Sequence, residues 1–199
     1  MFTLVAFLSI HVSGAINAGF SASSLNGCPP LLINFNSAPG INATCVWNFG
    51  NGNTSNLTNP SAMFTNPGIY TVKLVVTDGS HVDSSLQTIT VYELPVFNFN
   101  AADVTVCYDD TLKLFSHVVS SSAPITDYAW DFGDGISSSG SNTIHRYAIA
   151  GNYDVSLIVQ DAHSCIKSLT KPAYVRALPK PVASFFASPP FSCSATETI

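Results

Sequence analysis

Two runs of alternation between apolar and polar residues, broken only by Val75 and Ile158, dominate the pattern of the chain. They cover 70–76 and 153–159, with an aromatic or aliphatic side chain at every second position. Such alternation places the apolar side chains on one face of a β-strand and the polar ones on the other. Apolar and β-branched residues over 31–35 and 88–92 predict two further strands. Sustained helical periodicity is absent from the sequence, so we predict an all-β protein of short antiparallel strands packed as sandwiches.

The two runs belong to an internal repeat. Trp47 and Trp130 are 83 positions apart (130 − 47), and many other identities keep this offset. They are Phe49 and Phe132, Gly50 and Gly133, Gly52 and Gly135, Gly68 and Gly151, Tyr70 and Tyr153, Val72 and Val155, Leu74 and Leu157, Val76 and Val159, and Asp78 and Asp161. A fixed-offset repeat of this kind indicates homologous structural units in tandem. We therefore predict two modules, at 19–93 and 94–177.

The ends of the chain carry two further predictions. The segment 183–188 resembles 18–23, so we expect residues 178–199 to begin a third, truncated unit. Residues 1–18 contain an apolar run followed by small residues, a pattern typical of a secretory signal peptide cleaved after Ala15 or Ala18. No Lys or Arg precedes this run, and the alternative interpretation is a strand that belongs to an upstream segment. The run is too short for a membrane span, which needs about 20 apolar residues.

The amino-acid composition limits the kinds of partner that the protein can bind. Only 10% of the residues are charged and the net charge is −5, so the sequence has no basic surface for nucleic acid or anionic lipid. The apolar share of 46% excludes a disordered chain. Such a composition is common among extracellular β-proteins.

One motif occurs in both repeats. It reads Trp47-Asn48-Phe49-Gly50-Asn51-Gly52 in the first and Trp130-Asp131-Phe132-Gly133-Asp134-Gly135 in the second. Tryptophan and phenylalanine two residues apart lie on the same face of a strand, where they can fill the core of a sandwich. The Asn-Gly and Asp-Gly pairs favour a tight turn with positive φ. Tyr70 and Tyr153 resemble the corner tyrosine of immunoglobulin-like sandwiches, whose hydroxyl bonds back to the main chain.

These residues resemble the PKD domain. The resemblance covers both modules and rests on the Trp130–Gly135 motif followed by Gly151-x-Tyr153-x-Val155-x-Leu157-x-Val159-x-Asp161. It implies immunoglobulin-like β-sandwiches that serve extracellular proteins as spacers or ligand contacts. Arrays with cysteines placed in this way are similar to those of large surface and adhesion proteins of Bacteroidetes-type bacteria, and to accessory modules of secreted proteases and polysaccharide hydrolases. The first module departs from the pattern, with Cys45 in place of Tyr128.

The five cysteines are interpreted as disulfides first, because the context is secretory. The family resemblance implies a bridge between Cys107 and Cys165 within the second module. Val82 occupies the position of Cys165 in the first module, so Cys28 with Cys45 is the remaining pairing inside that module. The partner of Cys193 is expected beyond Ile199. A zinc site is disfavoured, since no Cys-x-x-Cys or nearby histidine spacing occurs.

Chemistry that depends on acidic groups receives little support. Asp131 and Asp134 could form half of a calcium site, yet the Asp-Gly pair and the asparagines at the matching positions favour turn residues. No motif for a nucleophile, a phosphate loop or a dinucleotide is present, and Glu93 and Glu197 are the only glutamates. We therefore predict a protein that is not an enzyme and needs no metal or cofactor.

Two functions remain. The first is a spacer or adhesion segment of a larger secreted or cell-surface protein, in which the modules contact their neighbours in the same chain. The second is an accessory module of a secreted protease or polysaccharide hydrolase that binds an extracellular protein or a glycan. Both tryptophans are predicted core residues, which favours the spacer, because sugars stack on exposed aromatic rings.

Overall fold

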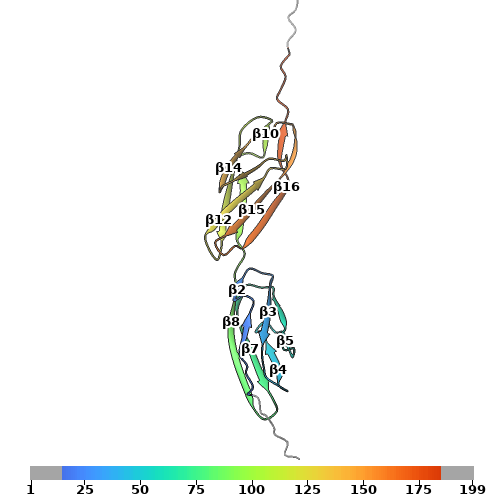
Figure 1. The fold of residues 1–199 in the computed structure, drawn as a ribbon. Helices are drawn as coiled ribbons and strands as arrows, with labels where there is room; N and C mark the ends of the chain where they lie inside the picture. The colour runs from blue at the N-terminus through green and yellow to red at the C-terminus, as the bar shows by residue number, and fades with distance from the viewer. Residues whose placement is uncertain (1–14, 185–199) are drawn as a thin grey trace, which may run out of the picture.

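The two alternating runs form long strands at the centre of each repeat, β7 (Gly68–Thr77) and β15 (Gly151–Asp161). The computed structural model describes residues 15–184, all of whose regular elements are strands. The fold is thus all-β, with two immunoglobulin-like sandwiches in tandem (Figure 1). The bulk of the predicted signal peptide and most of the predicted third unit lie outside the described residues.

Module 1, which comprises β1 to β8, packs a three-stranded sheet against a five-stranded one. The strand orders are β1-β3-β6 and β2-β8-β7-β4-β5. Besides β7, the strands are β1 (Phe20–Ala22), β2 (Asn26–Gly27), β3 (Leu31–Ser37), β4 (Thr44–Asn48), β5 (Thr54–Ser55), β6 (Ser61–Phe64) and β8 (Val82–Val91).

Module 2, which comprises β9 to β16, repeats this topology strand for strand. Its sheets have the orders β9-β11-β14 and β10-β16-β15-β12-β13. Besides β15, the strands are β9 (Val96–Ala101), β10 (Thr105–Cys107), β11 (Leu112–Ser120), β12 (Ile125–Asp131), β13 (Ser137–Ser139), β14 (Asn142–His145) and β16 (Ile166–Leu178).

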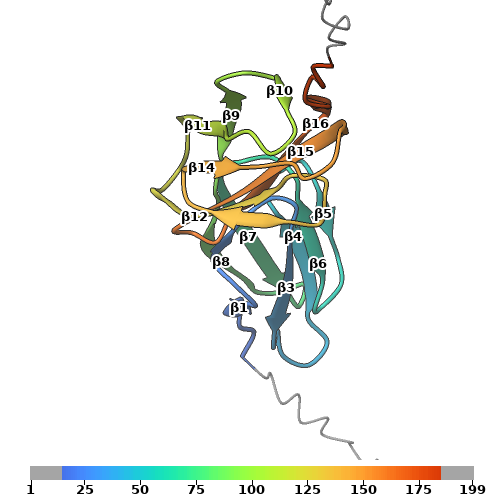
Figure 2. The same cartoon turned by 90° about the horizontal axis from the view of Figure 1, so that it is seen from above.

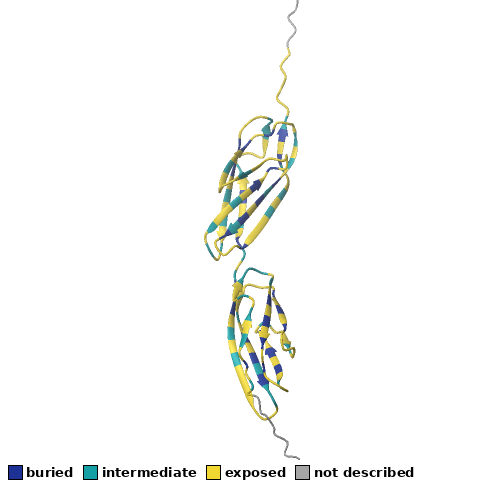
Figure 3. Cartoon of the chain, viewed as in Figure 1, coloured by how far each residue is buried: buried dark blue, intermediate teal, exposed yellow. Residues whose placement is uncertain are grey.

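The core of each module lies between its two sheets. In Figure 3, buried and exposed positions alternate along the strands, as the sequence pattern predicts. Trp47 and Trp130 are buried at the centre of the two cores, with the indole N–H of each donating to a backbone carbonyl at 2.8 and 2.9 Å. A satisfied N–H makes the burial of an indole favourable. Ala18 is fully buried in module 1, so a cleavage after it would remove a packed residue.

A short parallel strand closes one edge of each module. β2 pairs with β8, where Gly27 lies opposite Val91, and β10 pairs with β16, where Val106 lies opposite Ala177. Val91 and Ala177 in turn lie opposite the first residues of β7 and β15. The two edges therefore correspond position by position, and the residue that follows the matched pair is a cysteine in both modules.

The modules are stacked end to end, with the chain entering at one end and leaving at the other (Figure 1). Seen from above, along this direction, the two modules overlap in projection (Figure 2). The connection between β8 and β9 is only residues 92–95. Within 15–184, no helix could cross a membrane.

Candidate functional site

The turn of the repeated motif is built by its own side chains. In module 2, Asp131 accepts the N–H of Gly133 at 2.9 Å, and Asp134 accepts the N–H of Ile136 at 3.1 Å. The other carboxylate oxygen of Asp134 lies 2.7 Å from Nε2 of His145, which is stacked on Phe132. Asn48 and Asn51 make the same backbone bonds in module 1. These bonds support the turn interpretation over the calcium one, and residues 15–184 contain no cluster of three or more potential metal ligands.

The tyrosine corner is present in both modules. The hydroxyl of Tyr70 donates to the carbonyl of Asn66, and that of Tyr153 to the carbonyl of Ile149, both at 2.8 Å. Each bond fixes the loop that leads into the long central strand. The motif residues thus have structural roles, as expected of a PKD-type signature.

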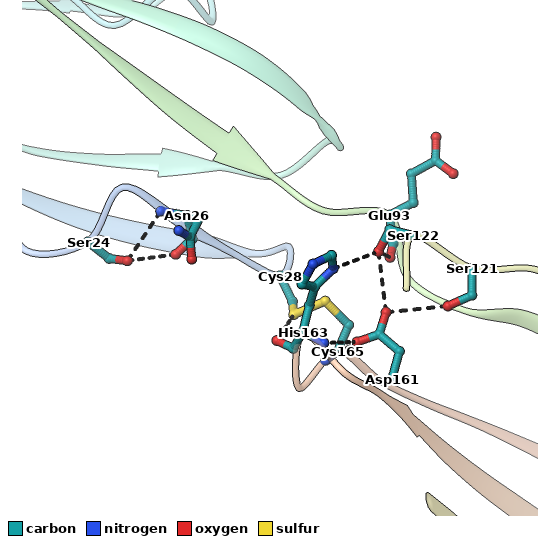
Figure 4. Close-up of a disulfide and its surroundings, with 9 residues drawn as sticks. All are labelled: Ser24, Asn26, Cys28, Glu93, Ser121, Ser122, Asp161, His163 and Cys165. Atoms are coloured by element: carbon teal, nitrogen blue, oxygen red, sulfur yellow. Dashed lines mark hydrogen bonds between the residues drawn. A yellow bond between two sulfur atoms is a disulfide. The ribbon is translucent and has the colours of Figure 1, made fainter. Parts of the chain in front are cut away.

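A covalent bond joins the modules, and it is a different disulfide from the two that were predicted. Cys28 of module 1 and Cys165 of module 2 are bonded, with Sγ atoms 2.01 Å apart and Cα atoms 5.4 Å apart (Figure 4). Among residues 15–184, Cys45 and Cys107 are free thiols, the first buried and the second partly exposed. The predictions of Cys107–Cys165 and Cys28–Cys45 are therefore wrong.

Distance within the sheet explains why Cys107 does not pair with Cys165. Cys107 lies opposite Leu178 at the last residue of β16, whereas Cys165 precedes Ile166 at its first residue. Thirteen residues of strand separate these ends by about 40 Å. A disulfide needs Cα atoms within about 7 Å, so this pairing cannot form.

The same argument excludes Cys28–Cys45. Cys28 follows the residue that pairs with Val91, next to the start of β7, while Cys45 lies opposite Val76 near its end. The two are thus about 25 Å apart along the strand. Strand partners therefore place the two cysteines of each module at opposite ends, and Cys28 and Cys165 lie at the ends where the two modules meet. Our sequence interpretation considered pairings inside a module alone.

Asp161 organises the turn that carries Cys165. This carboxylate is only 1% exposed, and one of its oxygens accepts the N–H groups of His163 and Cys165 at 2.9 Å. Its other oxygen accepts the hydroxyls of Ser121 and Ser122 at 3.4 and 3.3 Å. A buried carboxylate is tolerated when hydrogen bonds replace its hydration. These bonds hold the turn, and with it the Cys165 thiol, in position to meet module 1.

Two non-covalent contacts accompany the disulfide. The ring of Tyr92, in the connection, is stacked on His163 with centroids 3.7 Å apart and planes 5° from parallel. The hydroxyl of Ser122 lies 3.1 Å from the carbonyl oxygen of Glu93 and shares its one proton between this oxygen and the Asp161 carboxylate. We call Cys28, Cys165 and these residues, with Asp161, the inter-module junction. These contacts hold the end of module 1 against the turn that carries Cys165 in module 2.

The chain is similar to known proteins in both sequence and structure. The chain is 29% identical over 126 residues to the Pre-pro-metalloprotease PrtV of Vibrio cholerae serotype O1, a match that covers 63% of this chain and 14% of that protease. Among solved structures, the PKD1 domain of Vibrio anguillarum Epp is 29% identical, with a TM-score of 0.38, and covers 44% of this chain and 99% of its own. The PKD1 domain of the Vibrio cholerae metalloprotease PrtV is 28% identical, with a TM-score of 0.35, and covers 43% of this chain and 100% of its own.

The matched family covers both modules. The PKD domain is found at residues 15–92 and again at 92–177, which together exceed half of the chain. This match supports a non-catalytic role for both modules. Since the repeated motif, the strand topology and the family match coincide in each module, the chain belongs to the PKD domain family.

Proposed function

We propose that these modules form a stiff spacer in a larger extracellular or cell-surface protein. The observation that carries the proposal is the Cys28–Cys165 bond. A connection of four residues alone leaves two neighbouring domains free to rotate. The disulfide adds a second covalent link between them, and two links at separate points restrict both bending and twisting.

The same bond supports the proposed location. Disulfides persist in oxidising compartments, such as the cell exterior, and are rare in the cytosol. A structural disulfide between modules is thus best explained by secretion. An adhesive parent protein would need such a spacer to hold its binding domain away from the surface.

The accessory role in a secreted enzyme is the second candidate. It is favoured by the match of 126 residues to a Pre-pro-metalloprotease. A glycan-binding surface is disfavoured, because both tryptophans are buried in the cores and offer no exposed ring on which a sugar could stack. Binding of the chain to a glycan or matrix-protein array at micromolar affinity would favour this candidate over the spacer.

Residual dipolar couplings test the stiffness directly. In the oxidised chain we expect both modules to share one alignment tensor, since they tumble as one body. Replacing both bonded cysteines, in Cys28→Ser/Cys165→Ser, should give each module its own tensor and a lower order for one of them. Cys107→Ser, which removes a free thiol, is the matched control and should keep the shared tensor. Two different tensors in the oxidised wild type would refute the proposal.

A further inference from the structure

Cys107 occupies in module 2 the position from which Cys28 bonds in module 1. The strand register shows this equivalence. Gly27 lies opposite Val91 and is followed by Cys28. Val106 lies opposite Ala177 and is followed by Cys107. The partners Val91 and Ala177 are themselves equivalent, because they lie opposite Gly68 and Gly151. The repeat thus provides an internal comparison in which the same residue already forms a bond to the next module.

The segment that follows has the same spacing in both modules. From Val91 the chain runs Tyr92-Glu93-Leu94-Pro95-Val96, and from Ala177 it runs Leu178-Pro179-Lys180-Pro181-Val182. Proline and valine therefore come four and five residues after the matched strand position in each case. In module 1 this spacing places the next module so that its turn reaches Cys28. The same spacing after module 2 would present a following module to Cys107 in the same way.

The end of module 2 is open to such a partner. The Cys107 thiol is partly exposed and has no bonded partner among residues 15–184. It lies at the end of module 2 that is remote from Cys165, beside the point where the chain leaves the module (Figure 1). The Nζ atom of Lys180 lies 3.7 Å from a carboxylate oxygen of Asp109 and over the ring of Tyr108. These contacts hold the segment that leaves module 2 beside the residues that follow Cys107.

The receiving thiol has a defined place in its own module. Cys165 ends the turn after β15, four residues beyond Asp161, whose carboxylate accepts its N–H. In module 1 the same offset from Asp78 reaches Val82, whose side chain cannot form a disulfide. Module 1 thus lacks a receiving thiol. The bond that is present joins the edge cysteine of module 1 to the turn cysteine of the module that follows it.

We propose that Cys107 is the bonding site for a further PKD-type module, one that carries a cysteine at the end of the turn corresponding to 161–165. This deepens the proposed function, on which it rests, by naming the partner and the rule by which the array is extended. The bond forms by exchange: the two thiols lose two protons and two electrons to the disulfide of an oxidoreductase, which is released as a dithiol.

The proposed pairing of an edge cysteine with the turn cysteine of the following module is tested with an extended chain, in which a second copy of module 2 follows the first. Residues 1–181 are followed by a second copy of 96–184, so that the copy follows Pro181 as module 2 follows Pro95. The substitution Ile166→Val in the copy distinguishes its Cys165 peptide by mass. After alkylation of free thiols and tryptic digestion without reduction, we expect the peptide 74–113, which holds Cys107, linked to the tagged peptide 147–167. The Cys28–Cys165 link between the first two modules should be present in the same digest.

The outcomes separate the inference from the function on which it rests. Alkylated Cys107 beside an intact Cys28–Cys165 link would overturn the inference and leave the proposed junction standing. Loss of both links would overturn both. As a control, Cys107→Ser in the original module 2 of the extended chain should leave the tagged Cys165 alkylated. That result would show that the tagged Cys165 does not pair with another cysteine.

The unextended chain gives a second test that needs no added module. Glutathione disulfide should form a mixed disulfide at Cys107 at least about tenfold faster than at Cys45, because the first thiol is partly exposed and the second is buried in the core. Equal and slow reaction of both thiols in the folded protein would show that Cys107 is inaccessible, and would contradict the proposal.

Discussion

At the scale of single residues, the glycines of the repeated motif are required for different reasons. Gly133 has φ of 78°, and a Cβ on it would lie 2.5 Å from the carbonyl oxygen of Asp154. Gly135 has a similar φ of 85° with no atom within 4 Å of such a Cβ. The left-handed conformation alone costs an L-residue about 1–2 kcal/mol.

These environments give a matched pair of predictions. Gly135→Ala should destabilise module 2 by about 1 kcal/mol, and Gly133→Ala by more than about 3 kcal/mol, because the backbone must also move. Urea unfolding followed by tryptophan fluorescence measures both, since Trp130 lies in this core. Equal losses for the two variants would contradict the account of the turn.

Asp78 gives a prediction for pH. Its carboxylate accepts the N–H of His81 and of Ser80 at 2.7 and 2.8 Å, and these bonds lower its pKa from the ordinary 3.8 to about 2. The folded pKa lies below the unfolded one, so the contribution to stability is present above about pH 4 and is lost as the pH falls towards 2. Carboxyl ¹³C chemical shifts should show a midpoint near pH 2 for Asp78. A midpoint near 4 would mean that the turn does not hold the carboxylate.

At the scale of elements, the tyrosine corners make a comparison between modules possible. Tyr153→Phe removes one hydroxyl bond to the carbonyl of Ile149 and leaves the ring, which is stacked on Tyr147 with centroids 4.0 Å apart. We expect module 2 to lose about 0.5–1.5 kcal/mol in urea unfolding, and module 1 the same amount for Tyr70→Phe. A neutral result in both would show that the bond does not fix the loop.

The sequence was most informative about the strands and the turns. Period-two alternation placed β7 and β15, and the fixed offset of 83 placed the core tryptophans and the motif turns, because both are local properties of the chain. The disulfide could not be found in this way. Its two cysteines are 137 residues apart, and their meeting depends on which end of each sheet faces the neighbouring module. The available signal was that a cysteine follows the matched position of the parallel edge strand in both modules. This equivalence can be recognised only when the pairing register of β2 and β10 is known.

At the scale of the whole molecule, the disulfide should link the stabilities of the modules. Cys28→Ser/Cys165→Ser removes a cross-link of long sequence separation, and we expect a loss of about 2–4 kcal/mol in the unfolding free energy. Differential scanning calorimetry should show a lower transition temperature for the variant, with module transitions that separate. Cys107→Ser, the control, should remain within about 0.5 kcal/mol of the wild type. An unchanged transition in the double variant would mean that the modules do not depend on their junction.

The whole account depends on one covalent bond, which peptide mapping of the oxidised protein tests most directly. Free thiols are alkylated, and the unreduced chain is cleaved between Cys28 and Cys45 and on either side of Cys107 and Cys165. We predict a linked pair of peptides that contain Cys28 and Cys165, with Cys45 and Cys107 alkylated. A link between Cys107 and Cys165, or between Cys28 and Cys45, would contradict the inter-module junction and the spacer proposed from it.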